Sequence, residues 1–125
     1  MYFEIDSSNG VPVWEQVYRQ VAFAIANGII VPGEHIPSVR ALARDLAINP
    51  NTVARAYRDL QTEGVVEVIR GSGMMVTKAA KGKCKTIRTR VFKQQMSSMI
   101  HEARRSQLSD DEIRQLLERG LKQAV

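Results

Sequence analysis

The stretch from residue 36 to residue 76 constrains the fold of this chain more than any other segment. It holds two short runs in which apolar residues recur at helical spacing, and then a segment rich in β-branched residues that glycines interrupt. Pro50 separates the two runs, because a proline disfavours helical geometry at the residue before it and suits the first position of a new helix. This order predicts two short helices joined by a tight turn and followed by a two-stranded hairpin.

Capping residues set the bounds of both helices. Ser38 precedes the first apolar run, and its hydroxyl can accept a hydrogen bond from a free N–H group at the start of a helix. Asn49 is both the turn residue and the expected cap of the second helix, which runs from about residue 50 to residue 63. Gly64 is well placed to end that helix in a left-handed conformation. The buried stripes are predicted at Val39, Leu42, Ala43 and Leu46 in the first helix and at Val53, Ala56, Tyr57 and Leu60 in the second.

The side of the second helix that lies opposite its apolar stripe is polar. Asn, Thr and Arg side chains can reach base edges and phosphates in a major groove, and a recognition helix usually touches bases with its first turns. A solvated face of mixed charge would have a similar composition, so this face alone leaves both interpretations open. The residues concerned are Asn51, Thr52, Arg55, Arg58 and Asp59.

The segment after the second helix predicts a β-hairpin. Residues 65–69 are rich in β-branched types, residues 70–73 (Arg-Gly-Ser-Gly) form a turn, and residues 74–77 return as the second strand. Arg70 at the tip could enter a minor groove or pair with a phosphate. A hairpin that only covers the core explains the strands but explains this tip less well. Helices and hairpin together predict a winged helix-turn-helix, a mainly α fold with a small β-hairpin.

The residues before this stretch predict one long helix. Pro12 opens it and Gly28 ends it, after about residue 27. Trp14 and Tyr18 are expected to lie in the core or at an interface rather than to stack on a ligand. This helix should pack across the next two helices and complete a three-helix core. A short strand is predicted at residues 2–5, ahead of a turn-prone segment.

The composition changes after the hairpin. Residues 78–85 combine lysines, alanines and a glycine and predict a linker, and two helices follow, one over about residues 86–106 and one from Ser109. Ser109 and Glu112 have the spacing of a capping box. We therefore expect a winged helix-turn-helix domain at residues 1–78, a basic linker at 79–85 and a two-helix dimerisation segment at 86–125.

The two C-terminal helices are too small a piece to fold alone, so their apolar stripes must be buried against another surface. A second copy of the same pair is the preferred partner, because a two-fold dimer is the commonest soluble oligomer and lets a helix-turn-helix protein hold two half-sites. Packing against the first domain is the alternative. The residues expected at the dimer seam are Phe92, Met96, Met99, Ile100, Ile113, Leu116 and Leu117.

The net charge of +5 is unevenly distributed. Residues 1–78 hold seven basic and eight acidic side chains, a net charge of −1, whereas residues 79–125 hold eleven and five, a net charge of +6. Residues 78–93 contain seven Lys or Arg and no acidic residue, so this stretch is a candidate for contacts with phosphates beside each half-site. The nearly neutral first domain instead favours a winged helix that binds proteins. Against that alternative, the polar helix face lacks the aromatic anchors of a protein interface.

Several segments in order resemble the N-terminal domain of GntR-family transcription regulators. These are residues 12–17, 28–33, 36–43 and 49–53, with Ala56, Tyr57, Glu63 and Gly64, and together they cover roughly residues 10–78. The Asn-Pro-Asn-Thr-Val turn at residues 49–53 and the short C-terminal segment resemble the YtrA-type branch. Long-tailed relatives carry a separate effector-binding domain, for which the roughly 47 residues after the hairpin leave no room.

The resemblance implies a homodimeric regulator that binds double-stranded DNA, and it favours a repressor. An unidentified small-molecule effector is a further candidate partner. The resemblance and the residue types together nominate as DNA contacts Ser38, Arg40, Asn49, Asn51, Thr52, Arg55, Arg70 and Gly71.

The sequence lacks the patterns of an enzyme or a metal centre. His35 and His101 are isolated, no dinucleotide fingerprint is present, and no catalytic residue, metal or cofactor is expected. Cys84 is the only cysteine, which excludes an intramolecular disulfide, and a redox-sensing role for it is the minority interpretation. No apolar run could span a membrane and the N-terminus does not have the features of a signal peptide, so a cytoplasmic protein is expected.

Overall fold

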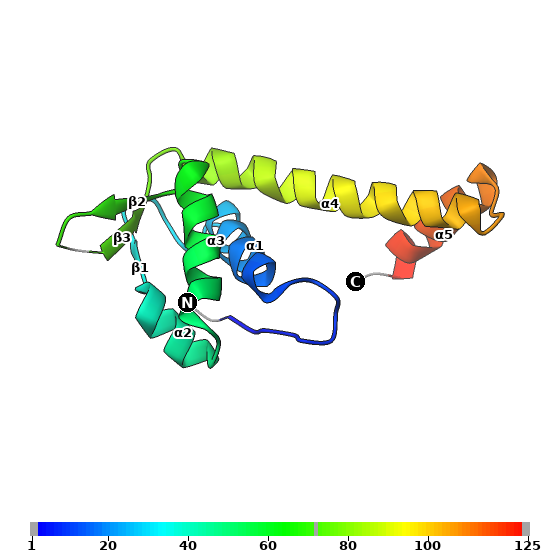
Figure 1. Cartoon of the computed structure of the whole chain (residues 1–125). Helices are drawn as coiled ribbons and strands as arrows, with labels where there is room; N and C mark the ends of the chain where they lie inside the picture. Colours follow the sequence, from blue (N-terminus) through cyan, green and yellow to red (C-terminus); the bar gives the residue numbers. More distant parts are fainter. Residues whose placement is uncertain (1–2, 72, 124–125) are drawn as a thin grey trace. The chain divides into compact units, whose positions relative to one another are not determined.

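Over residues 3–71 and 73–123, which the computed structural model describes, the chain forms five helices and three strands (Figure 1). In chain order these are α1 (Val13–Ala26), β1 (His35–Ile36), α2 (Val39–Leu46), α3 (Pro50–Thr62), β2 (Val66–Ile69), β3 (Gly73–Val76), α4 (Ala80–Arg105) and α5 (Asp110–Gln123). Two compact units result, Met1–Arg88 and Thr89–Val125, and the boundary between them falls within α4. The predicted class, mainly α with a small β-hairpin, is confirmed.

The core of the first unit lies among α1, α2 and α3, because α3 packs against both of the other helices. The stripe predicted on α3 is buried throughout, at Val53, Ala56, Tyr57 and Leu60. On α2 only the central pair, Leu42 and Ala43, is fully buried, and the two ends of the stripe are half-buried. The three-helix core predicted from the sequence is therefore present.

The predicted caps determine where these helices begin. The Ser38 hydroxyl accepts a hydrogen bond from the Ala41 N–H at 3.1 Å, and the Asn49 side-chain oxygen accepts one from the Asn51 N–H at 2.8 Å. Gly64 follows α3 with a φ of +78°, a left-handed conformation that glycine adopts without strain. At the tight turn between α2 and α3, Ala47 ends α2 in a left-handed conformation with its N–H bonded to carbonyls of α2, and the Asn49 side chain caps the start of α3.

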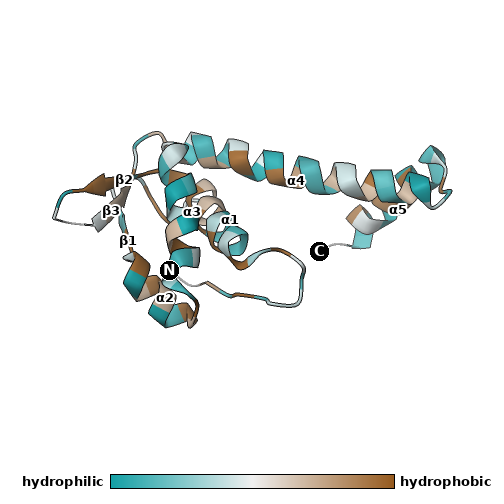
Figure 2. Cartoon of the chain, in the orientation of Figure 1, coloured by the Kyte–Doolittle hydropathy of each residue, from teal (hydrophilic) through white to brown (hydrophobic). Residues whose placement is uncertain are grey.

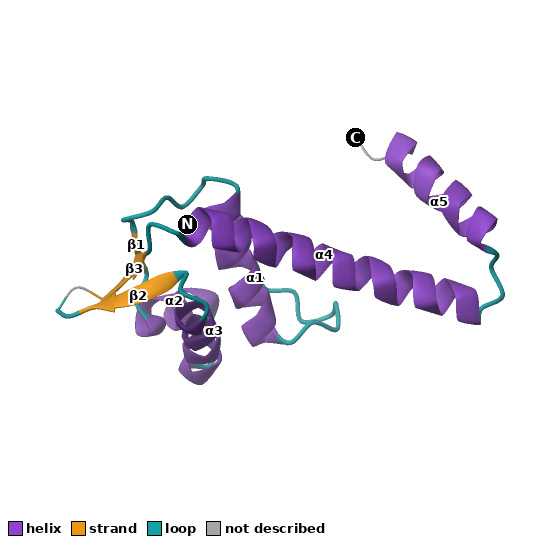
Figure 3. Ribbon diagram, turned by 90° about the horizontal axis from the view of Figure 1, so that it is seen from above, coloured by secondary structure: helices purple, strands orange, loops and turns teal. Residues whose placement is uncertain are grey.

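The sheet differs from the prediction by one strand. The hairpin of β2 and β3 is confirmed, but β1 adds to its edge, giving an antiparallel sheet of order β1-β3-β2 in which His35 lies opposite Met75 and Ile36 opposite Met74 (Figure 3). No strand was predicted at residues 35–36. Two residues carry too little periodicity to reveal a strand, and only the partner β3 defines it.

The strand predicted at residues 2–5 is absent over residues 3–5, and Tyr2 lies outside the described residues. The backbone there pairs with two glutamine side chains of α1 in place of another strand. The Gln20 side chain accepts from the Glu4 N–H at 2.9 Å and donates to the Glu4 carbonyl at 2.6 Å. The Gln16 side chain bonds the Asp6 N–H and carbonyl in the same way, at 2.9 and 2.7 Å. Buried Phe3 adds an apolar anchor to this segment.

The base of the hairpin is closed by Thr77. Its hydroxyl donates to the Gly64 carbonyl at 2.7 Å, and its N–H donates to the Val65 carbonyl at 3.0 Å. These bonds satisfy backbone groups at the point where the chain leaves α3 and where it leaves β3.

The prediction of a linker at residues 79–85 is wrong for residues 80–85, which form the first turns of α4, and the helix predicted from residue 86 begins at Ala80 (Figure 3). Ala80, Cys84 and Ile87 are buried at helical spacing in the first unit, and the Lys83 ammonium donates to the Glu63 carbonyl at 3.3 Å. Lysine and alanine are good helix formers, so their abundance did not indicate a linker. Hydrophobic and hydrophilic residues alternate along the whole of α4 (Figure 2).

The second unit contains the end of α4 and α5. The predicted capping box is present, because the Ser109 hydroxyl accepts from the Glu112 N–H and the Glu112 carboxylate accepts from the Ser109 N–H, both at 3.1 Å. Arg104 donates to both carboxylate oxygens of Asp110, at 3.0 and 3.2 Å, so the two helices are tied at their connection. This contact holds the pKa of Asp110 below its ordinary value and raises the pKa of Arg104.

Candidate nucleic-acid interface

The outward face of α3 presents the polar side chains that the sequence placed there. Asn51, Arg55 and Arg58 are exposed, and Thr52 is half-buried at the margin of this face. Pro50 begins the helix and has no N–H, and the N–H groups of Asn51 and Thr52 both donate to Asn49, so the side chains carry the donors at this end of α3. A helix N-terminus with amide and guanidinium side chains suits contact with an anionic polymer.

Two of the nominated contacts also serve as caps. The oxygens of Ser38 and Asn49 accept hydrogen bonds from their own helices, but the hydroxyl hydrogen of Ser38 and the side-chain amide hydrogens of Asn49 can still donate. Both residues are exposed, as is Arg40 in the first turn of α2. Each can therefore reach a phosphate without giving up its structural bond.

Arg55 makes a contact that the sequence did not predict. Its guanidinium carbon lies 3.9 Å from the centre of the Trp14 ring, which joins α3 to α1 by a cation–π contact. Trp14 is half-buried, in keeping with the expected packing role, but part of its ring surface is covered by this arginine. The spacing along α3 predicts that Arg55 faces outward, but only the packing of α1 against α3 shows what it rests on.

The tip of the hairpin is exposed at Arg70 and Gly71, where they were expected. Gly71 has a φ of +81°, and a Cβ built there would meet nothing within 4 Å, so the tip offers an open backbone surface. Val68 on β2 is also exposed, at 60%. The tip can thus offer one cation and unobstructed backbone to a partner.

The basic stretch beyond the hairpin is helical. Lys81 and Lys85 are exposed in the first turns of α4, whereas Lys83 is exposed but bonded to the carbonyl of Glu63. Arg88 donates to the side-chain oxygen of Asn27, so it too has a partner within the first unit. Of these four cations, Lys81 and Lys85 are the better candidates for phosphate contacts.

The nominated dimerisation residues gather on one apolar face of the second unit. Met96, Met99, Ile100, Leu116 and Leu117 line a groove of about 180 Å³ together with Ala103 and Ile113. Ile113 is buried, but Met99 is 63% exposed and Leu116 is 53% exposed. Phe92 is also exposed and does not line the groove. Contiguous apolar exposure of this kind marks an interaction surface.

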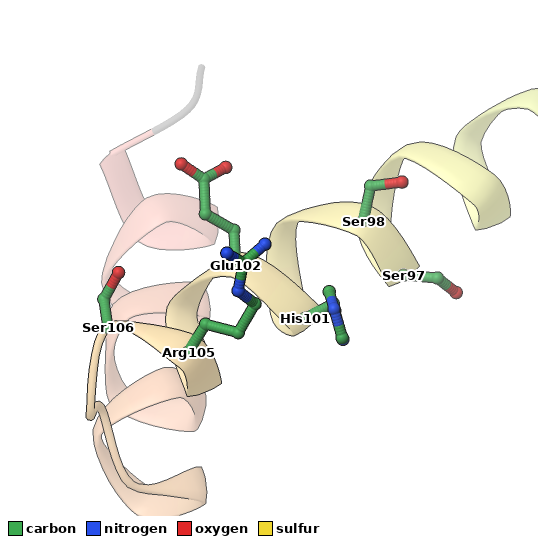
Figure 4. Close-up of a pocket in the computed structure, with 6 residues that line it drawn as sticks. All are labelled: Ser97, Ser98, His101, Glu102, Arg105 and Ser106. Atoms are coloured by element: carbon green, nitrogen blue, oxygen red, sulfur yellow. The ribbon is translucent and has the colours of Figure 1, made fainter.

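A polar hollow lies along the end of α4 (Figure 4). It is lined by Ser97, Ser98, His101, Glu102, Arg105 and Ser106, all from α4 or the residue directly after it. Within residues 3–71 and 73–123, no group of three or more His, Cys, Asp or Glu side chains could hold a metal ion. The helices of the same ranges include none that is suited to cross a membrane.

Cys84 is buried rather than exposed on a linker. Burial, with a smaller contribution from the Glu63 carboxylate, raises the pKa of the thiol to about 11. A buried thiol that remains protonated at neutral pH is a poor nucleophile, which argues against redox sensing.

Comparison with known proteins shows that the chain is similar to bacterial regulators of transcription. Residues 14–76 match the family model described as bacterial regulatory proteins, gntR family. The chain is 36% identical over 100 residues to the HTH-type transcriptional repressor YtrA of Bacillus subtilis, covering 80% of this chain and 77% of YtrA.

Solved structures agree with these sequence matches. A GntR family transcriptional regulator from Listeria monocytogenes aligns with a TM-score of 0.75 at 26% identity, covering 92% of this chain and 98% of that one. The DNA-binding domain of AraR in complex with the operator ORE1 aligns with a TM-score of 0.52 at 25% identity, covering 62% of this chain and 94% of that domain.

Proposed function

This chain belongs to the gntR family of bacterial regulatory proteins, and we propose that it is a sequence-specific repressor of transcription that binds a two-fold operator as a homodimer. The observation that carries the proposal is the exposed polar face of α3, which begins at Pro50 and stands beside a glycine-tipped hairpin. The repressor role is supported by the name of the Bacillus subtilis relative, and DNA binding by the AraR–operator complex. With DNA as its partner, the protein would act in the cytoplasm.

In this proposal α3 enters the major groove and Arg55 reads a base. A bidentate arginine–guanine contact discriminates against the wrong base by about 1–3 kcal/mol. Asn51 and Thr52 supply further polar contacts from the first turn of α3, and Arg70 and Gly71 approach the adjacent minor groove or its phosphates. The list of proposed contacts is completed by Ser38, Arg40 and Asn49 at the backbone phosphates.

The base-reading role of Arg55 can be tested with duplex DNA that the wild-type protein selects from a randomised pool. The ratio of affinities for that duplex and for a shuffled duplex measures specificity. We expect Arg55→Ala to lower this ratio by about 5- to 150-fold, since it deletes a base contact. Arg44→Ala, at an exposed residue of α2 outside the proposed contacts, is the matched control. An unchanged ratio in Arg55→Ala would reject the assignment, and a wild-type protein that does not prefer the selected duplex would favour the protein-binding alternative.

A second copy of the chain is the proposed occupant of the apolar face on the second unit. Two copies give the protein two α3 helices for two half-sites, which a single copy cannot provide. Met99→Lys places a charge on this face and should shift the dimer toward monomer by at least about tenfold in dissociation constant. Light scattering after size exclusion measures the shift, and Ser98→Lys on the same helix is the control. A wild-type monomer at micromolar concentration would refute the dimer.

We also propose that the exposed lysines at the start of α4 contact phosphates beside each half-site. Each lost contact should reduce the slope of log affinity against log salt by about 0.9. The double variant Lys81→Gln, Lys85→Gln should therefore reduce the slope. Lys83→Gln should change the slope less, because the Lys83 ammonium donates to the main-chain carbonyl of Glu63. Equal slopes in all variants would show that these lysines are only solvated.

A further inference from the structure

We propose that Trp14 is a specificity-determining residue, which holds Arg55 in the orientation with which that arginine reads a base. The inference rests on the proposed function, because it concerns the same arginine. The observation is the stacked geometry: the Arg55 guanidinium carbon lies 3.9 Å from the centre of the Trp14 ring. Trp14 lies on α1 and Arg55 on α3, so the contact joins two helices. Trp14 is assigned no contact with DNA and acts only by positioning Arg55.

Stacking leaves the hydrogen-bonding capacity of Arg55 intact. A guanidinium group is planar, and its five N–H donors lie in that plane. The Trp14 ring covers a face of the group, whereas a carboxylate partner would occupy its edge and use two donors. Asp59 is one turn further along α3, at the spacing of a helical ion pair, but no ion pair joins it to Arg55 in the described part of the chain. The edge of Arg55 is therefore free for a bidentate contact with a guanine.

Stacking also removes freedom that Arg55 would otherwise lose on binding. A free arginine side chain samples many rotamers, and fixing them when DNA binds reduces affinity. The helix that carries Trp14 is also tied to the end of α3. Tyr18, one turn from Trp14 on α1, donates a hydrogen bond at 2.5 Å to the carboxylate of Glu63, the residue after α3. A preordered arginine favours the duplex with a guanine at the right position over one that lacks it.

A double-mutant cycle tests the coupling. The probes are the duplex selected by the wild-type protein from a randomised pool and a shuffled duplex of the same composition. Trp14→Leu should lower the specificity ratio by about two- to fivefold, the range expected for an exposed cation–π contact. Trp14→Phe keeps an aromatic ring and should retain most of the ratio. In an Arg55→Ala background Trp14→Leu should have no further effect, and the salt dependence should match that of Arg55→Ala alone.

The outcomes separate the inference from the proposed function. If Trp14→Leu lowers the ratio equally with and without Arg55, the effects are additive and the positioning role is wrong, while DNA recognition stands. If Trp14→Phe loses as much as Trp14→Leu, the aromatic ring is not the cause and the role is also wrong. A wild-type protein without preference for the selected duplex rejects the proposed function itself.

The stack can be tested without DNA and without disturbing the fold. Trp14 is the only tryptophan, so the intrinsic tryptophan fluorescence reports this one residue. Arg55 is exposed, and Arg55→Ala should leave the melting temperature nearly unchanged while it raises the quenching of Trp14 by acrylamide. Equal quenching in wild type and Arg55→Ala would show that the stack is absent in solution and would overturn the proposal, even where Trp14→Leu does not fold.

Discussion

Replacing Ile87 by alanine tests whether the start of α4 is a docked part of the first unit. Ile87 is only 3% exposed, so the substitution removes an ethyl branch and a γ-methyl from a packed site. Three buried carbon groups at about 0.8 kcal/mol each give about 2.4 kcal/mol, and the cavity left behind adds to this. The better helix propensity of alanine returns about 0.4 kcal/mol. We expect a net loss of about 2–4 kcal/mol in the free energy of unfolding.

Urea unfolding followed by Trp14 fluorescence measures this loss, because Trp14 belongs to the first unit. With an m-value of about 1.5 kcal/mol/M, the midpoint should fall by about 2 M. Thr86→Ala changes an exposed residue of the same helical turn and should leave the midpoint nearly unchanged. If Ile87→Ala unfolds at the wild-type midpoint, the start of α4 is not docked in solution and the linker prediction would be reinstated.

Three further changes have defined outcomes. Cys84 should react with a thiol reagent at neutral pH only when urea opens the first unit. Since its pKa is raised from 9.0 to about 11, stability should fall as pH rises through this window. Cys84→Ala should make the fall smaller and should leave the contribution of Tyr57, whose pKa burial also raises. Because the pKa of Asp110 is lowered by Arg104, the stabilisation from this pair is present above the ordinary carboxyl pKa, so the difference in melting temperature between wild type and Arg104→Ala should disappear in acid. Thr77→Val should destabilise the hairpin by about 1 kcal/mol, measured by urea unfolding, because it removes the hydroxyl that donates to the half-buried Gly64 carbonyl.

The sequence predicted well those elements whose ends carry their own chemistry. Ser38, Asn49 and Ser109 cap helices, and each cap was identifiable because the capping group lies within three residues of its partner. The apolar stripe of α3 was equally local, since it repeats over the whole helix. The placement of Asn51 and Arg55 on an exposed face followed from that stripe alone.

The errors concern contacts between segments far apart in the chain. β1 has two residues and exists because β3 lies beside it, and nothing within residues 35–36 indicates this pairing. The stack of Arg55 on Trp14 depends on how α1 crosses α3, which spacing along either helix does not determine. At the start of α4, the stripe of Ala80, Cys84 and Ile87 was present, but two of its three members are small and the lysines between them obscured it.

The glutamine bonds that hold the N-terminal segment determine where this protein can be altered. Gln16 and Gln20 bind the main chain of Asp6 and Glu4, not their side chains. Sequence drift or redesign at positions 4 and 6 therefore keeps these bonds as long as the new residue is not proline, which lacks the N–H. The attachment therefore depends on the two side-chain amides of α1, together with buried Phe3. A change of either glutamine to glutamate would replace the amide donor with a second acceptor and so lose the bond to the main-chain carbonyl.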